Sequence, residues 1–305
     1  MAAPRTRAGS GTQFLDPAVL GRIGNLQLLA KTVVDGFLTG LHRSPYLGFS
    51  IDFAEHRAYM PGDDIRRIDW KLFARTDRYY IKLFEADTNA NFVVLLDVSK
   101  SMSYVSHSLT KLDYARYLAA CLTFFSSQQR DRVGLVTFDS EIVEWVRPSM
   151  KHLDTVLHVL DRATAGRRGS LEAPLLQVTE LLGRKGILVL ISDFYEDPDK
   201  VISAVGPLRA SGHDVVVFHV MDPAELEFPF EDPSGFEDME TQEQIPVIPL
   251  KLREDYKRMV SAHSEALRDR FTGNRIDYTL LDTSKPLDLA LFQYLLARER
   301  LSKTR

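Results

Sequence analysis

The chain of 305 residues is long enough for one large domain with a smaller unit attached. Its formal net charge of −4 excludes the strongly basic surface of a nucleic-acid-binding protein, and its single cysteine excludes an intrachain disulfide. No apolar run approaches the ~20 residues of a membrane helix and residues 1–16 lack the apolar stretch of a secretory signal, so we expect a soluble cytoplasmic protein.

The first 90 residues predict a helix followed by a small β-rich unit, and we treat residues 1–90 as an N-terminal unit. Apolar residues recur at helical spacing over residues 17–40, which predicts one amphipathic helix that ends near Gly36 or Gly40. A β-rich unit of this size needs the rest of the chain for its stability. Its strand-like segments are residues 49–59, 65–74 and 79–84.

From residue 91 onwards, continuous apolar segments alternate with helical patterns. Residues 92–96 form an apolar run that ends at Asp97, and such runs suit strands that are buried on both faces of a parallel sheet. The alternation predicts an α/β fold over residues 91–305, with a doubly wound, mostly parallel sheet. The expected strands are 92–96, 132–138, 142–146, 186–192, 214–220 and 276–281; the expected helices are 112–125, 151–163, 171–182, 199–210, 252–271 and 286–300.

An acidic segment, residues 222–243, interrupts this pattern. It contains nine acidic residues and no Lys or Arg, which indicates a surface excursion. We expect a hairpin in which residues 226–230 form a strand and residues 233–235 form the turn. Such a segment is usually a solvated loop; the alternatives are a weak cation site or a contact for a basic partner.

Three polar residues directly follow the first buried strand. Asp97, Ser99 and Ser101 alternate along the chain, and ligands of doubly wound sheets bind outside the carboxyl ends of the strands. Their oxygen atoms suit a hard cation such as Mg²⁺, and a carboxylate from another protein could complete its shell. In the alternative interpretation, these side chains only satisfy the loop backbone and cap the next helix.

This pattern resembles the metal-ion-dependent adhesion site of von Willebrand factor A domains. Their signature is Asp-x-Ser-x-Ser, a Thr from a second loop and an Asp after the fourth strand. The resemblance implies that Asp97, Ser99, Ser101 and Asp193 hold Mg²⁺, or another divalent cation such as Mn²⁺ or Ca²⁺.

The threonine position departs from the family. Where von Willebrand factor A domains usually have Gly-Gly-Thr, this chain has Gly-Arg-Arg-Gly-Ser at residues 166–170. Ser170 is the candidate for this position and Thr164 is the alternative. The two arginines add positive charge near the cation, so we expect a weaker metal affinity than the family pattern implies.

A second motif lies upstream. Residues 57–70, with the sequence RAYMPGDDIRRIDW, and the following Ala74-Arg75 resemble the hallmark of a bacterial family of unknown function. Its members join a short β segment to a von Willebrand factor A-type domain and are typically encoded beside MoxR-type AAA+ ATPases. The hallmark is either a salt-bridged turn or a docking surface for the ATPase. Its candidate partner-binding residues are Arg57, Tyr59, Asp63, Asp64, Arg66, Asp69, Trp70 and Arg75.

We therefore expect a non-enzymatic, metal-dependent protein-interaction module that works with a MoxR-type AAA+ ATPase and a client protein in assembly or maturation of a complex. One alternative is a metal-dependent hydrolase, but none of the eight histidines falls in the metal-site loops. The other is a structural scaffold with an empty site. The chain has no P-loop and no His-Glu-x-x-His zinc motif.

Overall fold

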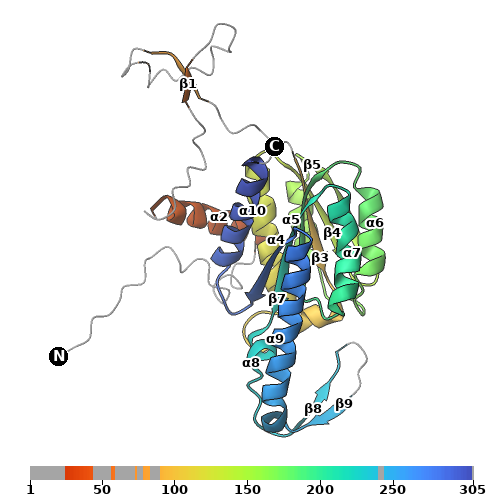
Figure 1. The fold of residues 1–305 in the computed structure, drawn as a ribbon. Coiled ribbons are helices and arrows are strands. Elements are labelled where there is room, and N and C mark those ends of the chain that lie inside the picture. Colours follow the sequence, from red (N-terminus) through yellow and green to blue (C-terminus); the bar gives the residue numbers. More distant parts are fainter. Residues whose placement is uncertain are drawn as a thin grey trace, which may run out of the picture.

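The computed structural model describes residues 25–43, 56–58, 73, 78–82, 90–239 and 244–303, and a six-stranded sheet forms its centre (Figure 1). Its strands are β3 (Asn91–Asp97), β4 (Arg132–Phe138), β5 (Ile142–Ser149), β6 (Gly186–Ser192), β7 (Asp214–Met221) and β10 (Asp277–Asp282). Their order is β10-β7-β6-β3-β4-β5, and within this sheet only the edge strand β5 is antiparallel to its neighbour. The predicted doubly wound, mostly parallel α/β fold is therefore confirmed.

Helices cover both faces of this sheet. One face carries α2 (Leu26–Arg43), α4 (Lys111–Gln128), α5 (Leu153–Arg162) and α10 (Asp288–Lys303). The other face carries α6 (Glu172–Leu181), α7 (Pro198–Ala210) and α9 (Pro249–Gly273). The short elements are η3 (Lys100–Ser103), α8 (Pro223–Glu227), and two separate antiparallel strand pairs, β1 (His56–Ala58) with β2 (Tyr80–Lys82) and β8 (Ser234–Glu237) with β9 (Gln244–Val247). None of the described helices is long and apolar enough to cross a membrane.

The position of β3 between two layers of helices explains why its sequence is continuously apolar. Val94 and Leu96 belong to the hydrophobic cluster on the α4 side, whereas Val93 and Leu95 belong to the cluster on the α7 side. All four side chains are fully buried. Because successive side chains of a strand point to opposite faces, a strand that is covered on both faces needs apolar residues at every position.

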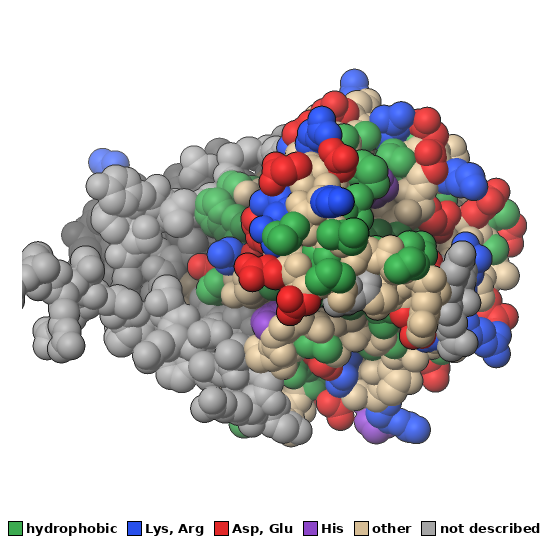
Figure 2. Space-filling model, turned by 90° about the horizontal axis from the view of Figure 1, so that it is seen from below, with side chains coloured by type: hydrophobic (Ala, Val, Ile, Leu, Met, Phe, Trp, Pro, Cys, Tyr) green, Lys and Arg blue, Asp and Glu red, His purple; other side chains and the backbone are tan. Residues whose placement is uncertain are grey.

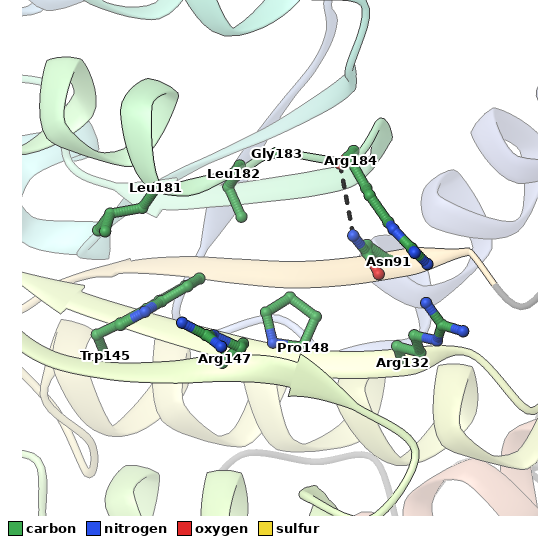
Figure 3. Close-up of a pocket in the computed structure, with 9 residues that line it drawn as sticks. All are labelled: Asn91, Arg132, Trp145, Arg147, Pro148, Leu181, Leu182, Gly183 and Arg184. Carbon is green, nitrogen blue, oxygen red and sulfur yellow. Dashed lines mark hydrogen bonds between the residues drawn. The ribbon is translucent and has the colours of Figure 1, made fainter.

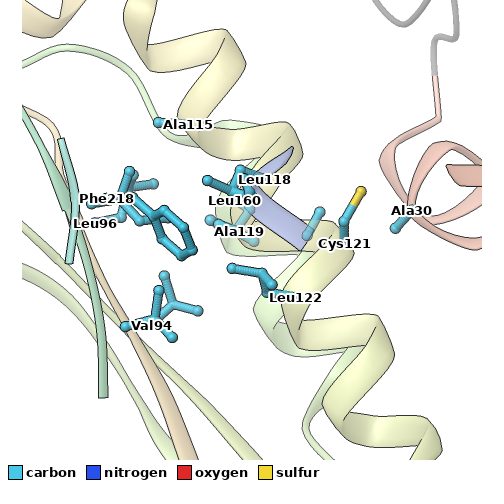
Figure 4. Close-up of a cluster of buried hydrophobic side chains, with 14 of the residues drawn as sticks. Ala30, Val94, Leu96, Ala115, Leu118, Ala119, Cys121, Leu122, Leu160 and Phe218 are labelled. Carbon is cyan, nitrogen blue, oxygen red and sulfur yellow. The ribbon is translucent and has the colours of Figure 1, made fainter. Parts of the chain in front are cut away.

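Helix α4 is itself covered on two sides (Figure 4). Ala119 and Leu122 face strand residues such as Val94, whereas Cys121 faces Ala30 of α2. A helix that is apolar around most of its circumference must be buried, which explains the composition of α4. The predicted boundary at residue 90 stays a prediction, but α2 contributes directly to the main hydrophobic core.

The predicted end of the first helix is wrong, because α2 continues through Gly36 and Gly40 to Arg43. A glycine costs a helix about 1 kcal/mol relative to alanine. Burial of a single side chain such as Val33 or Phe37 is worth about 1.5–3 kcal/mol, so packing against α4 and α5 outweighs this cost. The earlier part of the predicted helix lies outside the described residues.

The predicted hairpin strand at residues 226–230 is also wrong, because its first two residues belong to α8. Asp222 caps this helix through a capping box with Glu225, and Pro223 occupies the first helical turn. Asp222 is fully buried, so the acidic segment starts inside the protein. The hairpin forms later, where β8 pairs with β9.

Candidate metal site at the carboxyl edge of the sheet

The predicted metal site lies where two neighbouring parallel strands end. Asp97 is the last residue of β3, and Asp193 directly follows β6. Because the strands are parallel and in register, with Leu96 beside Ile191, both carboxylates reach the same edge of the sheet. Asp97 and Asp193 are only 5% and 3% exposed. Two residues far apart in the sequence therefore meet in a largely buried position.

Three serines lie around the Asp97 carboxylate. The Ser99 backbone N–H donates to Asp97 Oδ1 at 2.8 Å, and the Ser192 hydroxyl donates to Oδ2 at 2.6 Å. The hydroxyls of Ser99 and Ser101 form a hydrogen bond with each other, with their oxygens 3.1 Å apart. Mg²⁺ with metal–oxygen distances of about 2.0–2.1 Å in octahedral geometry holds neighbouring ligands roughly 3 Å apart. The two hydroxyls are therefore spaced as two ligands of one cation would be.

The loop before α6 is fastened to this site by its backbone. The Gly166 N–H donates to the carbonyl of Val98 at 2.7 Å, and the Ser170 N–H donates to the carbonyl of Asp139 at 3.1 Å. A Cβ atom on Gly166 would lie 2.7 Å from Asp139 Oδ2, so glycine permits the close approach. Ser170 consequently lines the site, whereas Thr164 is exposed and is not among the residues that line it.

One cleft of about 730 Å³ collects the predicted residues, and the side chains that could bind a cation are Asp97, Ser99, Ser101, Ser170 and Asp193. The rim of the same cleft carries charges of both signs, because Arg167, Arg168 and Lys200 are exposed there and Glu196 and Asp197 also line it. The described part of the chain contains no cluster of three or more His, Cys, Asp or Glu side chains that could hold a metal. A cation beside Asp97 would therefore depend on the serine hydroxyls as well as the carboxylates of Asp97 and Asp193.

A fully buried lysine is bonded to the second carboxylate of the site. Lys111 Nζ donates to Asp193 Oδ2 at 2.8 Å, to Glu225 Oε1 at 2.9 Å and to the Tyr195 hydroxyl at 3.1 Å. Tyr195 also donates from its hydroxyl to Glu225, and its ring centre is 4.5 Å from the ammonium nitrogen. Burial disfavours the charged lysine, but the carboxylates of Asp193 and Glu225 outweigh burial and raise the pKa of Lys111. Lys111 thus connects the site to α8.

Burial also changes the acidity of Asp97. Removal from water, followed by repulsion from the nearby Asp193 carboxylate, raises the pKa of Asp97 to about 7, although the hydrogen bonds from Ser192 and Ser99 oppose this shift. A cation would relieve the repulsion between the two carboxylates. The oxygen donors of the site are of the kind that a divalent cation prefers.

The sequence interpretation missed Lys111, Glu225 and the role of Ser192. Lys111 had a detectable signal, because it shares the helical stripe of Ala115 and Leu118, which are both buried. A lysine in the first turn of a helix also opposes the helix dipole and needs anionic partners. Glu225 gave no comparable signal within its acidic segment.

The upstream hallmark cannot be compared with this geometry. Its candidate residues from Tyr59 to Arg75 lie outside the described residues, and only the backbone of Arg57, in β1, is described. Their docking role therefore stays a prediction.

A second cavity, of about 270 Å³, lies at the opposite edge of the sheet (Figure 3). Arg132 begins β4 and Asn91 begins β3, while Trp145 and Arg147 come from the antiparallel β5. Arg184, from the connection before β6, closes one end of this cavity. None of the predicted metal-site residues lines it, so the structure separates the two cavities by the length of the strands.

A doubly wound sheet with Asp-x-Ser-x-Ser after its central strand and an aspartate after the neighbouring strand defines the class: the chain has a von Willebrand factor A-like domain. It belongs to the family described as protein of unknown function DUF58, whose model matches residues 55–266. This confirms the family of unknown function expected from the hallmark, whereas the link to MoxR-type ATPases stays a prediction.

Related sequences and folds were also found. An uncharacterized protein of Mycobacterium bovis and one of Mycobacterium tuberculosis are each 31% identical over 257 residues, which cover 81% of this chain and 80% of theirs. The conserved hypothetical protein BatB from Bacteroides thetaiotaomicron aligns with a TM-score of 0.49 and 16% identity, over 71% of this chain and 100% of that chain. The SpRpn10 VWA domain aligns with a TM-score of 0.37 and 12% identity, over 66% of this chain and 92% of that chain.

Proposed function

We propose that this protein is a Mg²⁺-dependent protein-interaction module. The observation that carries the proposal is the meeting of Asp97, Ser99, Ser101 and Ser170 in one open cleft, with Asp193 beside them. Three neutral hydroxyls beside Asp97 and Asp193 would leave a bound Mg²⁺ with open coordination positions. An Asp or Glu of a partner protein would occupy an open position and so bridge the two proteins through the metal.

The arrangement favours binding over hydrolysis. A metal-dependent hydrolase needs a positioned base beside the metal-bound water, and no histidine is among the described residues that line the cleft. The two further carboxylates that line it, Glu196 and Asp197, accept hydrogen bonds from the backbone N–H groups of Leu171 and Asp199. His219 lies nearby, but it is fully buried and its Nδ1 lies 2.7 Å from the Tyr278 hydroxyl oxygen. We therefore propose a module without catalytic activity of its own.

The partner follows from the resemblance of the upstream hallmark. Relatives that carry it are typically encoded beside MoxR-type AAA+ ATPases, so we propose that the module works with such an ATPase in assembly or maturation of a protein complex. The carboxylate that reaches the metal would come from the ATPase or from a client protein delivered to it.

The first test is metal binding by the purified protein. A ligand that binds only the folded state raises stability by about 2.7 kcal/mol at a hundred times its Kd. We expect MgCl₂ to raise the melting temperature of the wild type, relative to EDTA, and to leave that of Asp97→Ala unchanged. Ser101→Ala should reduce the effect. Ser140→Ala is the matched control, because Ser140 lines the same cleft but its hydroxyl donates to Asp139.

The second test is partner capture from the native host, in Mg²⁺ and in EDTA, followed by mass spectrometry. An AAA+ ATPase or a discrete client that is retained in Mg²⁺ and lost both in EDTA and with Asp97→Ala would support the proposal. Full-strength binding to the ATPase with Asp97→Ala would exclude the metal bridge. Absence of any Mg²⁺-dependent stabilisation would favour the scaffold with an empty site.

A further inference from the structure

The described residues 222–239 and 244–259, hereafter the arm, project beyond the carboxyl edge of the sheet (Figure 1). The arm contains α8, the β8–β9 hairpin and the first half of α9. Helix α9 is attached to the domain at His263, whose Nε2 donates to the carbonyl of Phe194 at 2.8 Å. From His263 back to Leu250, α9 extends roughly 20 Å at about 1.5 Å per residue. The arm therefore offers a surface on the side of the molecule where the metal cleft lies.

The arm has a small aromatic core of its own. The ring of Phe228 lies 4.4 Å from that of Tyr256, 5.2 Å from that of Phe230 and 5.6 Å from that of Phe236, measured between ring centres. Arg253 donates to the backbone carbonyls of Phe228 at 3.1 Å and Phe230 at 2.9 Å. These contacts join the hairpin to α9, so the arm is a built structure that needs no partner to define its shape.

This core leaves several large apolar side chains uncovered. In the hairpin, Ile245 is paired with Phe236 and extends the aromatic core to the surface. Five exposed large apolar side chains within 15 residues of one projecting segment are more than the scattered single ones of an ordinary surface, which favours an interaction surface. Their exposed fractions are 54% for Ile245, 51% for Ile248, 62% for Leu250, 39% for Leu252 and 66% for Met259.

The exposed part of the arm also has an excess of negative charge. Apart from the buried Asp222 and Glu225, its described residues include seven acidic and four basic ones, a net charge of −3. Two of the basic residues form ion pairs within the arm, Lys257 with Glu227 and Arg258 with Asp255. Acidic side chains such as Glu231 and Glu237 are exposed. Figure 2, viewed from the side to which the arm projects, shows acidic and hydrophobic side chains next to each other.

We propose that the arm is a docking surface for a partner-protein segment in which Lys or Arg residues stand beside aliphatic or aromatic ones. Exposed apolar side chains would supply burial, and the acidic charge would attract and orient a basic segment. The same charge repels an anionic lipid surface and the arm of a second copy. This surface is distinct from the metal bridge. The metal bridge would bind an Asp or Glu of the partner, whereas the arm would bind Lys or Arg residues and needs no metal ion.

The test uses the full chain and a short fluorescein-labelled peptide of alternating Lys and Leu, with binding followed by fluorescence anisotropy. We expect Ile248→Ser/Leu250→Ser to weaken binding about tenfold or more. Glu231→Lys/Glu237→Lys should weaken it and reduce its salt dependence. Leu176→Ser is the matched control, because Leu176 is 56% exposed on α6, away from the arm. EDTA and Asp97→Ala should leave peptide binding unchanged, which separates this surface from the metal site.

Any of three results would overturn the proposal once circular dichroism has shown that the variants are folded. The first is equal affinity of the peptide for the wild type and for Ile248→Ser/Leu250→Ser. The second is equal binding of a peptide in which Glu replaces Lys. The third is a wild-type dimer in sedimentation that the same double substitution dissociates, since a second copy would then cover the arm.

Discussion

The two edges of the central sheet differ in whether their charged side chains are buried or exposed. At the carboxyl edge, Lys111, Asp193 and Glu225 are buried and bonded to one another. At the amino edge, Arg147 and Arg184 line an open cavity and are exposed. Both edges are built from the same strands, so the strands themselves do not cause the difference.

The difference shows at which edge the protein bears the free-energy cost of burying charged groups. Removing a charge from water costs several kcal/mol, and buried ion pairs often contribute little net stability. Exposed arginines carry almost no such cost. Buried charges at the carboxyl edge hold Asp193 and α8 in fixed positions beside the cleft. This agrees with a site at that edge whose geometry must be preorganised.

The largest expected effect comes from Lys111→Met. This change leaves Asp193 and Glu225 buried without their cation, and loss of one partner of a buried ion pair costs about 3–5 kcal/mol. Urea unfolding at neutral pH would measure the loss. Lys257→Met is the control, because the Lys257–Glu227 pair is exposed and should matter far less. Similar stability losses for the two variants would contradict the expectation that the buried ion pairs of Lys111 matter more than the exposed Lys257–Glu227 pair.

A pH-dependent effect of about 2 kcal/mol is expected from His219. Burial, together with the charges of His263 and Lys111, lowers the pKa of His219 from 6.5 to about 3. The unfolded chain therefore binds a proton below pH 6.5 that the folded chain does not bind, and stability falls as the pH falls from 6.5 towards 3. At about 1.4 kcal/mol per pH unit, the loss at pH 5 is about 2 kcal/mol.

His219→Gln should remove this part of the acid sensitivity, which urea unfolding at several pH values would detect. The exposed His158 on α5 provides the matched variant His158→Gln. If both substitutions flatten the pH dependence equally, His219 is not the buried group responsible.

A smaller effect is expected where the loop that bears Ser170 approaches Asp139. Gly166→Ala would put a Cβ atom 2.7 Å from Asp139 Oδ2, and relief of such a contact costs about 1–2 kcal/mol. Gly206→Ala is the control, because nothing lies within 4 Å of its Cβ position in α7 and alanine favours a helix. Thermal unfolding should show a decrease for the first variant and a slight increase for the second. The loop would not need glycine if Gly166→Ala were neutral and kept its Mg²⁺ response.

The smallest effect is expected at the amino edge. Arg184→Ala removes an exposed side chain that has no ion pair with another described residue, so stability should change by no more than about 0.5 kcal/mol. The Mg²⁺-dependent shift in melting temperature should stay at the wild-type value. A larger loss of stability, or of the Mg²⁺ response, would mean that the two edges are coupled.

Much of the fold could be predicted because its signals are local. The apolar runs of β3 and β6 and the helical spacing of α5 and α7 depend only on neighbouring residues. The failures arose where packing or capping overrode that pattern. Burial of α2 against α4 carried the helix through two glycines, and the Asp222 capping box turned an expected strand into α8.

The sequence by itself determined the α/β fold and the positions of Asp97, Ser99 and Ser101, because strand periodicity and a short motif lie within a few residues. Only the tertiary structure decided that Ser170, rather than Thr164, lines the cleft. It also decided that Lys111 meets Glu225, 114 positions away. Such contacts depend on strand order and helix packing, which bring distant carboxylates and a lysine to one edge of the sheet, and no local pattern specifies them.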